Sequence, residues 1–230
     1  MKKILSLIIL VLGFVSLTNA QDQTVTVNTT HIYNVTDGGL TYTWAVTGGT
    51  STDLSGETGA SINILWDTQG TYTLTVFGKD ANNCNSETTT ATIEVVGAAS
   101  VMFADANDNQ SIITCSLLTG DTANTTDFKV VFAGGVAPYT LNYDVTDETG
   151  TTTSQTVTVN TTEQLLSLSD FENTTGSDII VSVVLTSATT SDGATVTVDT
   201  GTGAITGLPN DTRTVTVHAK PSISGSITLN

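Results

Sequence analysis

The stretch from Ser61 to Cys84 constrains the fold of this chain more than any other, because it holds two strict alternations of apolar and polar residues. Alternation with a period of two is typical of strands that bury one face. The apolar members are Ile62, Ile64 and Trp66 in the first run and Tyr72, Leu74 and Val76 in the second. The turn residues Asp67–Gly70 separate the runs. The sequence therefore predicts two strands of a β-sandwich, joined as a hairpin.

Further strand candidates recur between turn clusters, and no window after the first 20 residues keeps a helical spacing. Frequent Thr suits such strands, because β-branching favours an extended backbone while the hydroxyl faces water. The expected strands are Thr24–Val27, Thr41–Val46, Ser61–Trp66, Thr71–Phe77, Thr88–Val96, Val101–Phe103, Ile112–Cys115, Phe128–Phe132, Tyr139–Val145, Gln155–Val159, Ile179–Leu185, Ala194–Val198 and Thr214–His218. Short strands at this spacing predict an all-β protein.

The first 20 residues have the composition of a cleavable secretory signal. Lys2 and Lys3 precede an apolar run over residues 4–17, and the small residues Thr18 and Ala20 stand where a signal peptidase reads. The run is short for a bilayer span, and no second apolar run of about 20 residues follows. We therefore expect export without a membrane span, to the cell surface or extracellular space, or to the periplasm.

The length and the net charge of the chain limit the number of domains and the classes of partner. About 100 residues is typical of one sandwich, so 230 residues suit a signal and two sandwiches joined near Gly97–Ser100. The predicted units are a signal peptide at 1–20, a first sandwich at 21–97, a second at 98–220 and a C-terminal strand or tail at 221–230. The formal net charge is −16, so the surface repels nucleic acid and anionic lipid. Neither is an expected partner.

Two stretches resemble known modules. Ser61–Cys84 resembles the second half of a PKD-like domain, an immunoglobulin-like module with a Trp strand, a Gly turn, alternating Tyr, Leu and Val, and an Asn-Cys loop. Phe128–Tyr143 is similar to immunoglobulin-like repeats of surface and secreted proteins of Bacteroidota, in which a Gly-Gly turn and Pro-Tyr lead into the next strand. There, Gly134 and Gly135 permit positive φ, and Pro138 blocks pairing at the strand entry. The inward side chains of that strand are expected to be Tyr139, Leu141 and Tyr143.

The two resemblances imply a fold and a class of function. The fold is a pair of tandem immunoglobulin-like β-sandwiches, a PKD-like domain followed by a second immunoglobulin-like domain. Such modules together are typical of gliding-motility and type IX secretion proteins of Bacteroidota. The resemblance therefore implies a non-catalytic structural or adhesive protein of the cell envelope or surface, whose partners are other envelope or surface proteins. One departure is that no domain of the size of a type IX sorting domain is recognisable after Lys220.

The last ten residues follow Pro221 with a new alternation. Ile223, Gly225, Ile227 and Leu229 fall on one face of an extended segment. Such a segment either closes its own sheet or pairs with the exposed edge of another subunit. The sequence leaves both alternatives open.

No catalytic constellation and no cofactor are predicted. His31 and His218 are the only histidines, and His218 shares a polar face with Thr214 and Thr216, so neither a His-based triad nor a zinc site is supported. The acidic residues mark no specific pair for glycoside hydrolysis.

A metal site has one weak candidate, a string that imitates the start of a calcium loop and resembles the linker between cadherin repeats. Its oxygen ligands would be Asp105, Asn107, Asp108 and Asn109. Gln110 stands where an EF-hand needs Gly, and Ser116 stands where it needs Glu. A solvated turn is therefore the favoured interpretation.

Trp44 and Trp66 could stack sugars, which makes a carbohydrate-binding module with a polysaccharide ligand the alternative function. Their phase with neighbouring apolar residues favours two core tryptophans instead. Cys84 and Cys115 are the only cysteines, and export favours a disulfide. The predicted strands place Cys84 at the far end of the first sandwich and Cys115 in the second, so two unpaired thiols are slightly favoured over a bridge. Asp121–Ala123 resembles the O-glycosylation acceptor of Bacteroidota, with Thr122 as the candidate.

Overall fold

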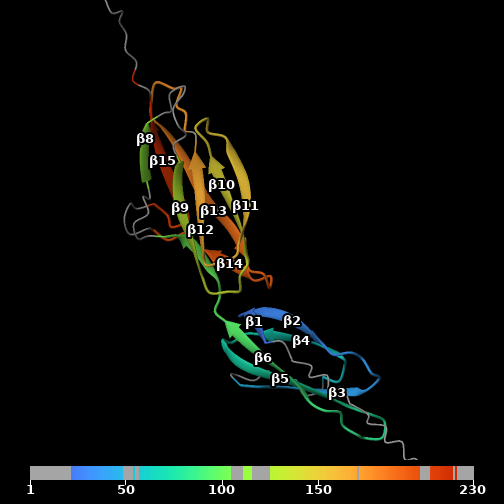
Figure 1. Cartoon of the computed structure of the whole chain (residues 1–230). Coiled ribbons are helices and arrows are strands. Elements are labelled where there is room, and N and C mark those ends of the chain that lie inside the picture. Colours follow the sequence, from blue (N-terminus) through green and yellow to red (C-terminus); the bar gives the residue numbers. More distant parts are fainter. Residues whose placement is uncertain are drawn as a thin grey trace, which may run out of the picture.

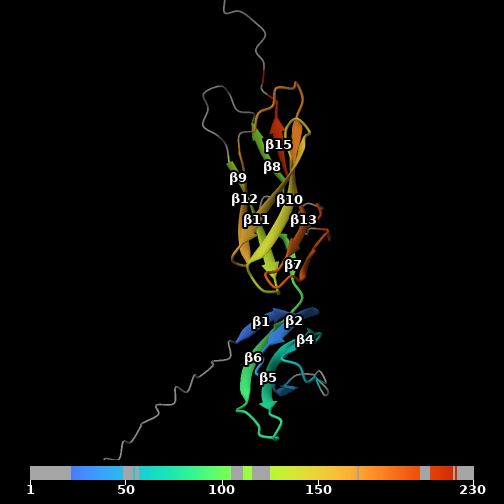
Figure 2. The same cartoon turned by 90° about the vertical axis from the view of Figure 1, so that its right-hand side faces the viewer.

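The computed structural model describes residues 22–48, 54, 57–104, 111–115, 125–169, 171–202, 208–219 and 221. Every regular element in them is a strand. Figure 1 shows two sandwiches placed end to end and joined by one extended segment, and the perpendicular view in Figure 2 agrees. The predicted all-β fold with tandem immunoglobulin-like sandwiches is confirmed. Among the described residues, no helix has the length and apolarity needed to cross a membrane.

The N-terminal sandwich has a four-stranded sheet facing a two-stranded one. The larger sheet contains, in order, β1 (Gln23–Thr26), β6 (Thr89–Val96), β5 (Gly70–Lys79) and β3 (Thr41–Thr47). The smaller sheet contains β2 (Thr29–Asn34) and β4 (Ser61–Trp66). The chain passes from one sheet to the other after β1, at Asn28, whose φ is 65°.

The two strictly alternating strands, β4 and β5, do not pair with each other. β4 pairs with β2, whereas β5 lies between β3 and β6 in the opposite sheet. The predicted hairpin is therefore wrong, and Asp67–Gln69 crosses between sheets. The predicted buried faces are confirmed, since Ile64 is fully buried and Trp66 is 1% exposed. An alternating pattern indicates which face of a strand is buried. It does not indicate whether two such strands are neighbours in one sheet or face each other across a core.

The C-terminal sandwich is larger and its two layers are linked by hydrogen bonds. One layer contains β11 (Thr152–Val159), β10 (Tyr139–Thr146), β13 (Ile179–Thr189), β15 (Thr212–His218) and β8 (Ser111–Cys115). The other contains β12 (Glu163–Ser169), β9 (Thr125–Ala133), β7 (Ser100–Phe103) and β14 (Thr195–Val198). Because β14 pairs with both β13 and β7, it closes one side of this sandwich.

The core of the C-terminal sandwich contains one charged side chain that the sequence did not reveal. Arg213 of β15 is fully buried, with its guanidinium carbon 4.7 Å from the centre of the Phe103 ring. Nη1 donates a hydrogen bond to the Thr212 carbonyl at 2.7 Å, and Nη2 donates one to the Ala104 carbonyl at 3.3 Å. Carbonyl acceptors and the face of an aromatic ring both offset the cost of burying a cation.

Candidate functional site

Polar residues of both sandwiches meet at the joint between them. It is built on the tight turn Thr190–Ala194, which links β13 to β14 and faces the N-terminal sandwich. The Gly193 N–H donates to the Thr190 carbonyl at 3.1 Å, and the Thr190 N–H donates to the Ala194 carbonyl at 2.9 Å. Gly193 has a φ of 84°, a conformation that favours glycine. The turn thereby presents Asp192 to the neighbouring sandwich.

Asp192 joins the two sandwiches through its carboxylate. The Oδ2 atom accepts a hydrogen bond from the Thr26 N–H, and Oδ1 accepts one from Thr26 Oγ1 at 3.0 Å. Thr190 Oγ1 donates a further hydrogen bond to Oδ1. The His31 ring completes the surroundings, with Nε2 3.8 Å from Asp192 Oδ2 and 2.8 Å from Thr29 Oγ1. One carboxylate therefore connects β1 to a turn 166 residues away in the sequence.

The hydrogen bonds keep Asp192 ionised. Burial by itself raises the pKa of this carboxyl, but the donors from Thr190 and Thr26 outweigh burial and hold the pKa below its ordinary value of 3.8. Each of these donors binds the charged carboxylate more strongly than the neutral acid. At neutral pH the joint therefore has its full set of hydrogen bonds.

The second part of the joint is the linker between β6 and β7, which packs against the Gly-Gly turn of the C-terminal sandwich. The Gly135 N–H donates to the Gly97 carbonyl at 2.9 Å. Gly134 and Gly135 have φ values of 70° and 68°, as the sequence predicted. A Cβ atom on Gly134 would lie 2.3 Å from the Ala98 carbonyl oxygen, so close approach of the linker also requires glycine here. The sequence did not indicate this second role.

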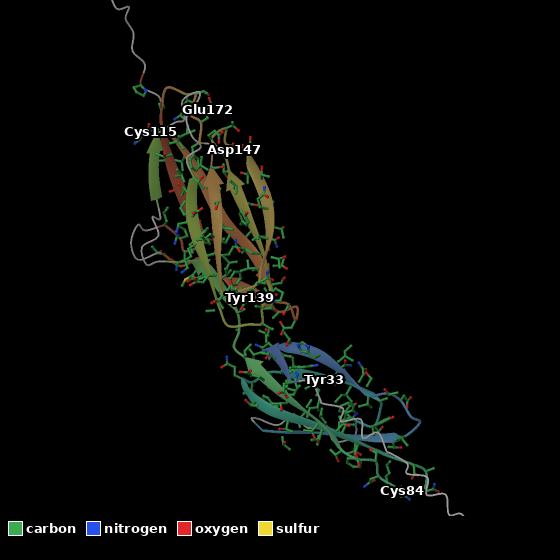
Figure 3. The ribbon with its side chains drawn as sticks, viewed as in Figure 1. Tyr33, Cys84, Cys115, Tyr139, Asp147 and Glu172 are labelled. Atoms are coloured by element: carbon green, nitrogen blue, oxygen red, sulfur yellow. The ribbon has the colours of Figure 1, made fainter. Side chains whose placement is uncertain are left out.

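The sequence-predicted site residues are not brought together in this joint. The calcium candidates Asp105, Asn107, Asp108 and Asn109, the glycosylation candidate Thr122 and the signal at 1–20 lie outside the described residues. Cys84 and Cys115 lie at opposite ends of the molecule in Figure 3 and are not joined in a disulfide. The side chains of His31 and His218 lie in different sandwiches, and His218 Nδ1 is 2.8 Å from Asp178 Oδ2.

Both tryptophans are core residues, as predicted. Trp44 is 5% exposed and donates from Nε1 to the Gly59 carbonyl at 2.9 Å. Trp66 is 1% exposed and donates from Nε1 to Tyr33 Oη at 3.0 Å. At this depth neither indole forms an exposed platform of the kind on which sugar rings stack.

Comparisons with known proteins leave the family of this chain unassigned. No protein-family model matches it, and no curated protein matches it. The fibronectin(III)-like modules of CbhA from Clostridium thermocellum are 11% identical, with 88% of this chain and 92% of that chain covered and a TM-score of 0.32. Rst D1-D2 is 15% identical, with coverages of 87% and 96% and a TM-score of 0.37.

A tetra-tandem repeat from the extending region of a large adhesion protein is 19% identical, with coverages of 86% and 49% and a TM-score of 0.33. Likenesses at this level assign no activity. The fold assignment rests instead on the sheet order and on two separate buried cores.

Asp192 is the principal residue of the joint that sequence reasoning missed. Its only signal is the Ser-Asp-Gly sequence between two strand candidates, which is typical of a tight turn. Such a turn indicates that Asp192 lies at the surface of its own sandwich. It does not reveal that the neighbour is Thr26 of another sandwich.

Proposed function

We propose that this protein is a non-catalytic spacer of the bacterial cell envelope or surface, in which two sandwiches are held end to end to display a binding end away from the membrane. The joint is the observation that carries the proposal. A carboxylate that accepts hydrogen bonds from Thr26 and Thr190, together with a linker packed on Gly134 and Gly135, opposes free rotation of one sandwich against the other. A spacer without such contacts would bend at every linker.

We further propose that the bounds of the two domains are 21–97 and 98–220. The two buried cores support this division, because one contains residues from Val25 to Val95 and the other contains residues from Ala99 to Val217. We also propose that residues 1–20 are removed on export.

The finer assignment is to gliding-motility or type IX secretion assemblies of Bacteroidota. It is supported by the PKD-like pattern of Ser61–Cys84 and by the repeat-like pattern of Phe128–Tyr143. In such an assembly the partners would be other envelope or surface proteins. The alternative is a carbohydrate-binding module. Trp44 and Trp66, which would have been its exposed platforms, are both buried.

Fractionation combined with protease shaving of intact cells tests the location. A surface protein is cut in intact cells, whereas a periplasmic one is cut only after the outer membrane is opened. Recovery of the protein from the cytoplasm, with residues 1–20 still attached, would contradict export. A shift of the intrinsic tryptophan fluorescence on addition of envelope polysaccharides would restore the carbohydrate-binding alternative.

A further inference from the structure

The N-terminal sandwich has an open groove of about 350 Å³ between the end of β2 and the start of β6. Its floor consists of core side chains, namely Trp44, Leu74 and Val76. Its rim includes Ile32, which is 66% exposed and is the most exposed large apolar side chain of the described residues. None of the residues that line the groove is charged. The groove is therefore an uncharged opening with an apolar floor and polar rim residues such as Gln23, Asn34 and Thr90, in a strongly acidic protein.

A free strand edge runs along the groove. β6 pairs with β5 over residues 89–95, but β1 covers only Ile93–Val96 on the other side. Among the described residues, no strand pairs with the remaining edge at Thr89–Thr92. β2 pairs only with β4 in the described part of the chain, so its second edge is open as well. Unpaired backbone groups beside an apolar floor are the two elements that a docking β-strand requires.

The chain contains a segment with the pattern that this groove requires. In residues 222–230, Ile223, Gly225, Ile227 and Leu229 alternate with polar residues, so an extended conformation places all four on one face. The segment has no charged side chain, as the groove has none. Two copies with a net charge of −16 each repel one another, and a neutral contact is where that repulsion is weakest.

Residues 222–230 lie outside the described residues, but the described strands before them set a distance to the groove of the same chain that is longer than this segment. β15 ends beside the start of β13, since Val217 pairs with Ile179, whereas the joint lies at the other end of β13. β13 has 11 residues and spans about 36 Å. The groove lies at the start of β6, and Figure 1 shows that β6 runs from there towards the linker and the joint. Nine residues extend over about 30 Å at most.

We propose that residues 222–229 of one copy add a strand beside Thr89–Thr92 of a second copy, so that copies join head to tail. The donor and acceptor surfaces are different, so the interface is heterologous and repeats into a filament unless the rotation closes a ring. This inference deepens the proposed function, on which it rests, because it names the partner of the spacer as another copy of the same chain. An extended assembly of spacers then needs no further scaffold protein.

The decisive experiment compares three forms of the mature full-length chain by sedimentation velocity over a wide concentration range. The unmodified chain is expected to associate. The double variant Ile223→Asp/Ile227→Asp is expected to remain a folded monomer, because its charges would lie against the apolar floor of the groove. The matched control Ser224→Asp/Ser226→Asp adds the same charge on the other face of the same segment and is expected to associate as the unmodified chain does.

Hydrogen exchange locates the acceptor. The amides of Thr89–Thr92 are expected to be protected in the associated chain and to lose protection in the Ile223→Asp/Ile227→Asp variant. A synthetic peptide with the sequence of residues 221–230, added to a chain that ends at Pro221, is expected to restore the protection and to change the fluorescence of Trp44.

Four results would overturn the proposal. The unmodified chain could stay monomeric at every concentration, or the control variant could dissociate as fully as the double variant. Protection at Thr89–Thr92 could persist in the monomeric variant, which would mean that residues before β1 fill the groove. Unfolding of the chain truncated at Pro221 would mean that the tail closes its own sheet. None of these results changes the protease-shaving outcome, so the location of the protein is tested separately.

Discussion

The two sandwiches differ in how their two layers are linked. In the C-terminal sandwich β14 hydrogen-bonds to both layers, and β13 pairs with β10 on one side and with β14 and β15 on the other. In the described part of the N-terminal sandwich, the smaller layer contains β2 and β4, and β1 covers about half of the outer edge of β6. The strand β14 thus joins the two layers of the C-terminal sandwich, whereas no described strand does so in the N-terminal one. Strand edges remain in both, because β11 and β12 end the sheet order of the C-terminal sandwich and β1 covers only part of β6 in the N-terminal one.

The comparison also separates two uses of polar residues. Arg213 is buried inside the C-terminal core, where backbone carbonyls and the Phe103 ring surround it. Asp192 belongs to the same sandwich but points out of it, and its acceptor atoms bind Thr26 of the other sandwich. Arg213 therefore stabilises the core of one sandwich, whereas Asp192 holds the two sandwiches together. Substitutions at the two sites should therefore have distinguishable effects.

The largest expected effect comes from truncating an aromatic side chain in either core. Trp66→Ala should destabilise the N-terminal sandwich by about 3–5 kcal/mol, and Phe128→Ala should destabilise the C-terminal one by a similar amount. If the two cores are energetically independent, calorimetry will show that each substitution lowers one unfolding transition and leaves the other in place. A single transition that shifts with both substitutions would show that the sandwiches unfold as one unit.

Next in size is the loss of the buried cation. Arg213→Ala should destabilise the C-terminal sandwich by about 2–4 kcal/mol, because it leaves a cavity beside Phe103 and removes donors from the Thr212 and Ala104 carbonyls. Chemical denaturation monitored by circular dichroism measures the change. Thr214→Ala, on the half-buried outer side of the same strand, is the control and should cost much less. Equal losses at the two positions would show that Arg213 has no special role.

Asp192→Asn should have a smaller effect, and on the joint rather than on either core. The uncharged amide oxygen is a weaker acceptor for Thr26 and Thr190, so docking of the sandwiches should weaken by about 1–3 kcal/mol. Small-angle scattering should then report a broader range of interdomain angles, while both unfolding transitions stay close to those of the unmodified chain. Asp147→Asn is the control, since Asp147 accepts hydrogen bonds from Thr149 and Thr151 at an exposed turn away from the joint.

The same joint has a defined pH dependence. The pKa of Asp192 is lowered in the folded protein. The contribution of this carboxylate to docking of the sandwiches is therefore complete at pH values above its ordinary pKa of 3.8, and it is lost as the pH falls through the lowered pKa. Scattering of the unmodified chain should therefore show no loosening between pH 5 and 8. A chain that loosens within that range would contradict control of the joint by Asp192.

Much of the fold could be predicted because half-buried strands have a strong periodic signal. Each of the thirteen expected strands overlaps an observed one. β2 was missed because its most apolar residue, Ile32, points outward. β12 was missed because Leu165 is exposed next to buried Leu166, which breaks the alternation. The pairing of β4, the burial of Arg213 and the contact of Asp192 depend on residues far away in the sequence, and no local pattern encodes them.

The smallest expected effect concerns the cysteines, where the sequence left a disulfide open. Cys84 is exposed in the loop after β5. Its N–H donates to Asp80 Oδ1 at 2.8 Å and its carbonyl accepts from the Asp80 N–H at 3.1 Å, so hydrogen bonds rather than sulfur hold the loop. Cys84→Ser and added reductant should each change stability by less than about 0.5 kcal/mol. Iodoacetamide should label Cys84 in the folded chain, with Cys84→Ser as the blank. A peptide linking Cys84 to Cys115, recovered from the monomeric fraction under non-reducing conditions, would contradict the placement of these residues at opposite ends of the molecule.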